Sequence, residues 1–404
     1  MKKTLLTICL TWMCFSLSAQ KIIDLSGKWS FSIDRQDNGE KEKWFSHTLN
    51  DFINLPGSMP EKLKGDEVTA KTQWTGSLYD SSYYYNPYME KYRKEGNIKF
   101  PFFLTPDKHY VGAAWYQKEV NIPADWKGER ILLFLERPHI ETTVWVNGQK
   151  TGMQNSLCVP HQYDITHYVR PGKCTITIRV DNRIKEINVG PDSHSITDQT
   201  QGNWNGIVGR ICLQTTPKTY FDDIQIYPEP EQKLARVKVV IKGTGTAKVK
   251  LSAESFNTDK KHIVPAIQQE IKLNKGVTET EMVLPMGNDM LLWDEFHPAL
   301  YKLKAEVTNG KKTEIKEIQF GMRRFEIKGK WFYVNGRKTQ LRGTVENCDF
   351  PLTGYAPMDV ESWERVFRIC RSYGLNHMRF HSFCPPEAAF MAADRVGFYL
   401  QPEG

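Results

Sequence analysis

The stretch that decides the fold runs from Gln340 to Gln401 and reads QLRGTVENCDFPLTGYAPMDVESWERVFRICRSYGLNHMRFHSFCPPEAAFMAADRVGFYLQ. Its apolar and amphipathic runs alternate, which predicts a strand, a helix, a strand, a helix and a strand in turn. The predicted strands cover 340–345, 375–382 and 398–401, and the predicted helices cover 359–373 and 385–396. Strands connected through helices pair in parallel with right-handed crossovers. The stretch therefore predicts the first three β/α units of a TIM (β/α)8 barrel.

Local signals support both helices. Asp359 is a favourable N-cap residue, and either Pro385 or Pro386 is suited to begin the second helix. The apolar positions of the first helix recur on one face, at Trp363, Val366, Phe367 and Cys370. A closed barrel needs eight units, so we expect this chain to be the front portion of a larger enzyme, with most of its catalytic residues beyond Gly404.

The part of the chain before residue 219 predicts a β-sandwich or jelly roll, because short alternating strands follow one another between turns. Glu141–Asn147 alternates and ends in Asn147-Gly148, a strong hairpin signal. Cys174–Asp181 also alternates. Its three aliphatic side chains are expected to point to one face, and these are Ile176, Ile178 and Val180.

Residues 219–320 contain fewer aromatic residues and more alternating Lys and Glu. About seven strands in such a length predict an immunoglobulin-like sandwich. The predicted domains are therefore a jelly roll at 20–218, an immunoglobulin-like sandwich at 219–320 and the start of a barrel at 321–404.

Residues 1–19 are predicted to be a cleaved signal peptide. Lys2 and Lys3 precede the apolar run Leu5–Leu17, which is too short to span a bilayer. The sequence Leu17-Ser18-Ala19 provides a small-residue cleavage site. We expect a secreted or periplasmic protein without a membrane span.

Composition argues against other classes of function. The formal net charge is +7 and the basic residues form no cluster, so nucleic acid is not an expected partner. Six cysteines follow the signal peptide, and none has CxxC spacing, so no metal site or other cofactor is expected. Six cysteines allow 15 full pairings, and the sequence does not choose between them or indicate an oligomeric state.

Seven stretches, in order along the chain, resemble the glycoside hydrolases of family 2, which include β-galactosidases, β-glucuronidases and β-mannosidases. They are AWYQK (114–118), TVWVNG (143–148), YDIT (163–166), RPGKCTITIRVDN (170–182), WNGIVGRICL (204–213), GMRRF (321–325) and FYVNGRKTQLRG (332–343). The resemblance extends over nearly all of the mature chain. It implies the family's domain order of jelly roll, immunoglobulin-like domain and barrel.

The resemblance also implies the chemistry. Family members hydrolyse terminal β-linked sugars with retention, through two carboxylates that lie ~5–5.5 Å apart. The acid/base glutamate follows strand four of the barrel and the nucleophile follows strand seven. Because this chain contains neither strand, no residue is assigned as catalytic and the chain alone is expected to be inactive. The expected partner is a carbohydrate.

Polar residues follow all three predicted barrel strands, at the end where barrels place their active sites. The candidates for a substrate pocket are Glu346, Asn347, Asp349, Arg379, His381 and Glu403. A charged Arg379 within a strand requires an acidic partner, so its alternative role is a structural ion pair. The residues after the first strand could instead cap the next loop. Glu403 matches the glutamate that ends the third strand in the family, and a supporting role is expected for it rather than metal binding.

Three aromatic residues of the predicted jelly roll are candidates for stacking on sugar rings: Trp74, Tyr84 and Trp204. The alternative is that they pack between domains, where aromatic residues contribute much of the contact energy. Two functions of different classes thus remain open. One is the front portion of a secreted exo-β-glycosidase, and the other is a non-catalytic carbohydrate-binding or scaffold protein.

Overall fold

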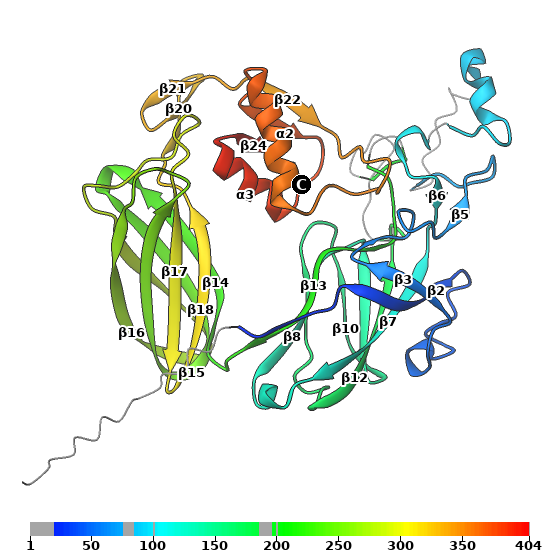
Figure 1. The fold of residues 1–404 in the computed structure, drawn as a ribbon, viewed down its shortest axis with the longest axis horizontal. Helices are drawn as coiled ribbons and strands as arrows, with labels where there is room; N and C mark the ends of the chain where they lie inside the picture. The colour runs from blue at the N-terminus through cyan, green and yellow to red at the C-terminus, as the bar shows by residue number, and fades with distance from the viewer. Residues whose placement is uncertain (1–19, 76–84, 100–101, 186–195, 199–200, 404) are drawn as a thin grey trace, which may run out of the picture.

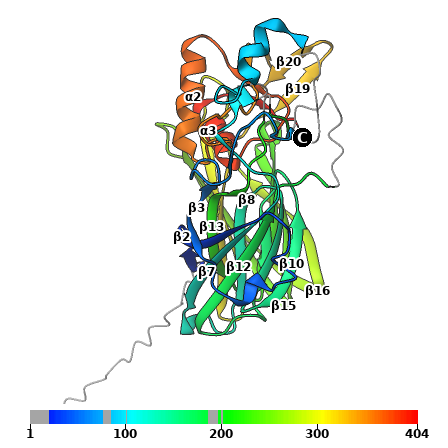
Figure 2. The same ribbon diagram turned by 90° about the vertical axis from the view of Figure 1, so that its right-hand side faces the viewer.

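A computed structural model describes residues 20–75, 85–99, 102–185, 196–198 and 201–403. The predicted signal peptide lies outside these residues. Two β-sandwiches lie beside each other, and a smaller α/β segment at the C-terminal end of the described chain lies across one end of the pair (Figures 1 and 2). The candidate site belongs to this α/β segment, which the two sandwiches support from one side.

The first sandwich consists of two antiparallel sheets that enclose one apolar core. One sheet has the order β1 (Ile22–Asp24), β13 (Gly206–Thr216), β8 (Arg130–Pro138) and β11 (His161–Asp164), with β4 (Gly57–Ser58) also paired to β13. The other sheet has the order β10 (Gln149–Asn155), β9 (Glu141–Val146), β12 (Gly172–Asp181), β7 (Ala113–Ile122), β2 (Gly27–Asp34) and β3 (Asp51–Leu55). A separate two-stranded pair joins β5 (Asp66–Glu67) to β6 (Lys108–His109).

Two local predictions for this sandwich are confirmed. The aliphatic residues of β12 that alternate along the strand, Ile176, Ile178 and Val180, all lie in the core. The hairpin between β9 and β10 turns at Asn147 and Gly148, which both have positive φ angles of 50° and 77°. Positive φ at both positions is the requirement of a type I′ turn, which explains why Asn-Gly occurs there.

The outer face of the six-stranded sheet is also covered. Trp115 and Trp145 project from it and stack with ring centroids 4.9 Å apart, and the segment 35–49 lies over them through Trp44, Phe45 and Leu49. The same segment includes the 3₁₀ turn η1 (Trp44–Ser46). This cover explains why polar residues of β12 that alternate away from the core are nevertheless buried.

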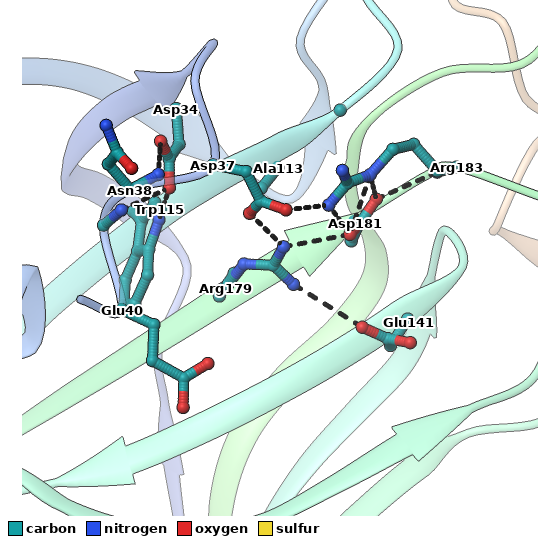
Figure 3. A network of polar contacts seen from close by, with 12 residues as sticks. Asp34, Asp37, Asn38, Glu40, Ala113, Trp115, Glu141, Arg179, Asp181 and Arg183 are labelled. Carbon is teal, nitrogen blue, oxygen red and sulfur yellow. Dashed lines mark hydrogen bonds and ion pairs between the residues drawn. The ribbon is translucent and has the colours of Figure 1, made fainter. Parts of the chain in front are cut away.

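A network of charges fastens that covering segment to β12 (Figure 3). The Arg179 guanidinium is 2.6 Å from Asp37 and 3.0 Å from Asp181, while Arg183 is 2.6 Å from the same two carboxylates. Asp181 is fully buried and Arg179 is 7% exposed. Burial alone would raise the pKa of Asp181, but hydrogen bonds from Arg183 and Lys185 outweigh it and hold the pKa well below its usual value.

The second sandwich is built from five strands that form one continuous hydrogen-bonded sheet, and two of these strands are 23 residues long. The strands are β14 (Tyr220–Glu229), β15 (Leu234–Phe256), β16 (Ile263–Pro285), β17 (Leu300–Asn309) and β18 (Lys312–Phe320). The first half of β15 pairs with β14 and its second half pairs with β17. The sequence predicts two separate strands at 236–241 and 247–253, because polar residues separate two apolar-alternating runs. In the structure they are two halves of one strand, which shifts register between Gly243 and Gly245, where Gly245 has a φ of 85°. Counting each half of β15 and β16 gives the strand number expected for an immunoglobulin-like sandwich.

A short antiparallel sheet connects the second sandwich to the α/β segment. It consists of β19 (Phe325–Lys328), β20 (Trp331–Val334) and β21 (Arg337–Thr339). Beyond it the chain forms β22 (Gly343–Glu346), α2 (Val360–Ser372), β23 (His377–Phe380), α3 (Glu387–Val396) and β24 (Tyr399–Gln401). The three strands form one parallel sheet in the order β22, β23, β24, as predicted.

The helices follow their sequence signals closely. The Asp359 carboxylate accepts a hydrogen bond of 2.8 Å from the Ser362 N–H, which makes it the N-cap of α2. Trp363 and Phe367 are buried, and Val366 and Cys370 pack against the same core, which confirms the predicted stripe. Helix α3 begins at Glu387, so Pro386 is its N-cap rather than its first residue, and it ends at Val396, followed by the C-cap Gly397 with a φ of 76°.

The strands are shorter than predicted. Gln340–Arg342 was expected to begin the first strand, but β22 starts at Gly343. The Gln340 carbonyl and the Arg342 N–H bond instead to the side chain of Asn376, while the Arg342 carbonyl accepts from the Asn376 main-chain N–H at 2.9 Å. Within the described residues no helix is long and apolar enough to cross a membrane.

Candidate functional site

Four polar residues meet where the parallel strands β23 and β24 end. Arg379 lies opposite Val345 and Gln401 in the strand register, on the face of the sheet away from Met378, which packs in the helix-covered core. Its Nε donates to one oxygen of Glu403, and the Ser382 hydroxyl donates to the other oxygen at 2.8 Å. Both carboxylate oxygens of Glu403 are thereby held, so the group has a fixed orientation. We call Arg379, His381, Ser382 and Glu403 the strand-end cluster.

The electrostatics of the cluster favour an ionised Glu403. The hydrogen bond from Arg379 lowers the pKa of Glu403 below its usual value, the bond from Ser382 adds to this, and a protonated His381 acts in the same direction. The side chains of Arg379 and Glu403 remain 42% and 25% exposed. The cluster therefore presents a fixed, charged and accessible surface on which hydroxyl or carboxylate groups of a ligand could bind.

A segment of the first sandwich reaches this cluster. The Gln201 side-chain N–H donates to the His381 carbonyl at 3.2 Å, and Gln201 is only 7% exposed. The His381–Ser382 peptide that comes next is cis. Sequence reasoning identified Arg379, His381 and Glu403 as candidates but missed Ser382 and Gln201. Ser382 directly follows His381 and could have been found from that position, whereas no pattern connects residue 201 to residue 381.

The candidates after β22 do not join the strand-end cluster. Glu346 lies opposite Phe380 and so belongs to the helix-covered face, where its carboxylate accepts from the Cys348 N–H at 2.5 Å. Burial raises the pKa of Glu346. The bond to Cys348 is a local cap of the loop, which agrees with the alternative role predicted for these residues.

Asn347 and Asp349 each have one buried side-chain oxygen without a hydrogen-bond partner in the described residues. Burial raises the pKa of Asp349. Asp349 lines a crevice of about 980 Å³ between the first sandwich and the connection from β22 to α2, together with Glu136, Arg210 and Glu387. Of the six predicted pocket residues, Arg379, His381 and Glu403 therefore belong to the strand-end cluster, and Asp349 lines this separate crevice.

The two aromatic candidates that the structure describes, Trp74 and Trp204, are both buried. Trp204 is 5% exposed, stacks on His139 at 4.5 Å between centroids and contacts Tyr355 at 5.5 Å. Trp74 is 8% exposed and packs with Phe102. A sugar ring stacks on an exposed aromatic face, which neither residue offers, so packing accounts for both. Tyr84 lies outside the described residues.

Among the residues that the structure describes, no group of three or more His, Cys, Asp or Glu side chains is arranged to hold a metal ion. The geometry of the cluster instead suits ligand binding through hydrogen bonds and charge.

Replacing Arg379 by glutamine is expected to raise the pKa of Glu403 toward its usual value of 4.5, because the largest stabilising interaction of the carboxylate is lost. The pKa is measured by NMR titration of the carboxyl carbon. Ser382→Ala should raise it by a smaller amount, since Arg379 remains. An identical titration of Glu403 in the wild type and in Arg379→Gln would contradict the role given to Arg379.

Two family models match this chain. The model of the sugar binding domain of the glycosyl hydrolases family 2 covers residues 22–217, and a second family 2 model covers residues 219–323. Together they include both β-sandwiches.

Curated relatives carry glycosidase names. The chain is 27% identical to a putative β-glucuronidase of Formosa agariphila over 74% of this chain and 36% of the relative. It is 23% identical to the β-glucuronidase of Homo sapiens over 94% of this chain and 56% of the relative. It is 24% identical to a β-galactosidase of Thermoanaerobacter pseudethanolicus over 76% of this chain and 41% of the relative. The chain spans about half the length of the curated relatives it matches.

Solved structures share the fold. A family 2 glycosyl hydrolase from Bacteroides cellulosilyticus superposes with a TM-score of 0.70 at 21% identity, covering 95% of this chain and 47% of that one. A β-glucuronidase from Ruminococcus gnavus in complex with D-glucaro-d-lactam also superposes with a TM-score of 0.70. The identity is 20%, and the match covers 95% of this chain and 59% of that one. The family models, the relatives and the shared fold agree: the chain belongs to glycosyl hydrolase family 2.

Proposed function

We propose that this chain is the N-terminal portion of a secreted, retaining exo-β-glycosidase that removes terminal β-linked sugars from glycans. The observation that carries the proposal is the position of the strand-end cluster. Arg379, Ser382 and Glu403 meet at the C-terminal ends of parallel strands, directly after two sandwiches that match family 2. That end is where (β/α)8 barrels place their catalytic residues.

The proposed organisation has four parts. Residues 1–19 are a signal peptide, 20–218 a jelly roll, 219–320 an immunoglobulin-like sandwich and 321–404 the start of a TIM barrel. Further β/α units, encoded beyond residue 404, close the barrel and supply the two catalytic carboxylates. The relatives support this arrangement, since they are longer than this chain and are named as β-glucuronidases and β-galactosidases.

The proposed chemistry requires two carboxylates with different roles. One attacks the anomeric carbon and the other first donates a proton to the leaving oxygen and then activates water. We assign neither role to Glu403, because Arg379 and Ser382 occupy both of its oxygens. Its proposed role, with Arg379, is to form one wall of the sugar pocket and to orient ligand hydroxyls there.

The gene is expected to continue beyond the codon for Gly404. Sequencing past that codon should reveal an open frame of several hundred codons, with an Asn-Glu pair after a fourth barrel strand and another glutamate after a seventh. A stop codon directly after Gly404 would contradict the proposal. The function to test would then be non-catalytic carbohydrate binding, with family 2 membership unchanged.

A further inference from the structure

Three cysteines from distant parts of the chain line one small cavity. Cys158 lies between β10 and β11 of the first sandwich, Cys384 lies between β23 and α3, and Cys348 follows β22. The cavity has a volume of about 60 Å³ and lies between the first sandwich and the α/β segment. All three cysteines are partly buried. The cavity therefore brings together thiols that the sequence gives no reason to pair.

One arginine holds the backbones of two of these cysteines beside each other. The Arg137 guanidinium donates to the Cys158 carbonyl at 3.2 Å and to the Cys384 carbonyl at 3.0 Å. It also donates to the Pro385 carbonyl at 3.3 Å. A guanidinium is a rigid planar group, so acceptors that share it are confined to a small region. The two segments are thus already in contact before any covalent bond is considered.

Both side chains line this cavity. After burial, the nearby Cys158 thiol is the next cause that raises the pKa of Cys384. The neighbours that affect the pKa of Cys348 are Glu346, Arg137 and Asp349 rather than either cysteine. Among the three cysteines, Arg137 bonds to the main-chain carbonyls of Cys158 and Cys384, so these two form the candidate pair.

We propose that Cys158 and Cys384 form a disulfide bond that joins the first sandwich to the α/β segment. In this step the two S–H bonds break and one S–S bond forms. The two electrons and two protons pass to an external disulfide, which is reduced to two thiols. In an exported protein that partner is a thiol–disulfide oxidase, and oxidised glutathione serves the same purpose in solution. The proposal does not depend on the glycosidase assignment.

The position of the bond gives it a structural consequence. It closes a very long loop, which restricts the unfolded chain more than a short loop does. It also anchors the connection after β23, which carries His381 and Ser382 of the strand-end cluster. A bond at this place would hold the cluster against the first sandwich, which also contributes Gln201.

Peptide mapping tests the pairing directly. The full chain is incubated with oxidised glutathione, its remaining thiols are alkylated, and it is digested with trypsin without reduction. Cys158 falls in the peptide 151–173, Cys384 in 380–395 and Cys348 in 343–365, so every pairing has its own mass. The expected product is 151–173 linked to 380–395. Alkylated thiols in both peptides, or a link between 380–395 and 343–365, would overturn the proposal.

Thermal unfolding provides a second readout. Reduction with dithiothreitol is expected to lower the unfolding midpoint of the oxidised protein by roughly 4–10 °C. Cys158→Ser should remove this shift. Cys370→Ser is the matched control, because Cys370 is also partly buried but lies on α2 outside the cavity, and it should keep the shift. A shift that survives Cys158→Ser would show that another pair is responsible.

Discussion

Replacing Asp181 by alanine is expected to lower the free energy of unfolding of the first sandwich by about 3 kcal/mol. Asp181 is fully buried and is contacted by Arg179, Arg183 and Lys185 at 2.6–3.0 Å. Without Asp181, the buried positive charge of Arg179 loses one of the carboxylates that neutralise it. The expected effect is at the low end of the range for a broken buried pair, because Asp37 still contacts Arg179 at 2.6 Å. Native-state hydrogen exchange at the amides of β12 and β7 measures the change.

The effect of this substitution should depend on pH. The pKa of Asp181 is depressed in the folded state. Its contribution to the free energy of unfolding is therefore fully present above the pKa of the unfolded chain, about 3.9, and is lost as the pH falls toward the pKa of the folded state. The difference between wild type and Asp181→Ala is therefore constant near neutral pH and shrinks in acid. The control is Glu119→Gln, which removes an exposed pair with Lys173 and should change stability by less than about 1 kcal/mol. A change for Asp181→Ala no larger than that of the control would contradict the role of the network.

Replacing Asn376 by alanine is expected to release the α/β segment from the sandwich beside it. Asn376 is 3% exposed, and its amide donates to the Glu295 carboxylate at 2.5 Å and to the Gln340 carbonyl at 3.1 Å. The side-chain carbonyl oxygen of Asn376 accepts a hydrogen bond from the Arg342 main-chain N–H at 2.7 Å. The substitution leaves a buried carboxylate and a main-chain donor without partners, which costs about 3 kcal/mol. Hydrogen exchange in β22, β23 and β24 should accelerate accordingly.

The second sandwich provides an internal reference for that experiment. Amides in β15 and β17 should exchange as in the wild type, since their core does not include Asn376. Asn97→Ala is the matched control, because the Asn97 amide also donates to a main-chain carbonyl, at 2.8 Å, but in an exposed setting. This substitution should leave hydrogen exchange in β22–β24, β15 and β17 unchanged. Unaltered exchange in β22–β24 of Asn376→Ala would show that other contacts hold the segment in place.

The sequence predicted element types well where local chemistry determines them. The Asp359 cap, the Trp363–Phe367 face and the Asn147-Gly148 turn each depend on a few neighbouring residues, and each is confirmed. The continuous strand β15 is predicted from sequence as two strands, because the polar stretch 242–246, which includes Gly243 and Gly245, indicates a turn. Whether such glycines end a strand or bend it depends on the partner strand, which lies outside any local window.

The site was only partly predictable for the same reason. The periodicity of the chain placed Arg379 and Glu403 at strand ends, and the structure brings them together. Glu346 also follows a strand, but its register turns it to the opposite face. The contact from Gln201 and the burial of Trp204 between His139 and Tyr355 depend on how distant segments pack. Composition and spacing carry no signal for such contacts.

The measurement that tests the central claim most directly is hydrolysis of nitrophenyl β-glycosides. The product of the gene read through beyond codon 404 is compared with the 404-residue chain, using the glucuronide, galactoside and mannoside, and the anomer released is followed by NMR. We expect turnover of at least one substrate with retention by the longer protein, and no turnover above the blank by the 404-residue chain. Hydrolysis by the 404-residue chain itself, or release of the inverted anomer, would contradict the proposed function.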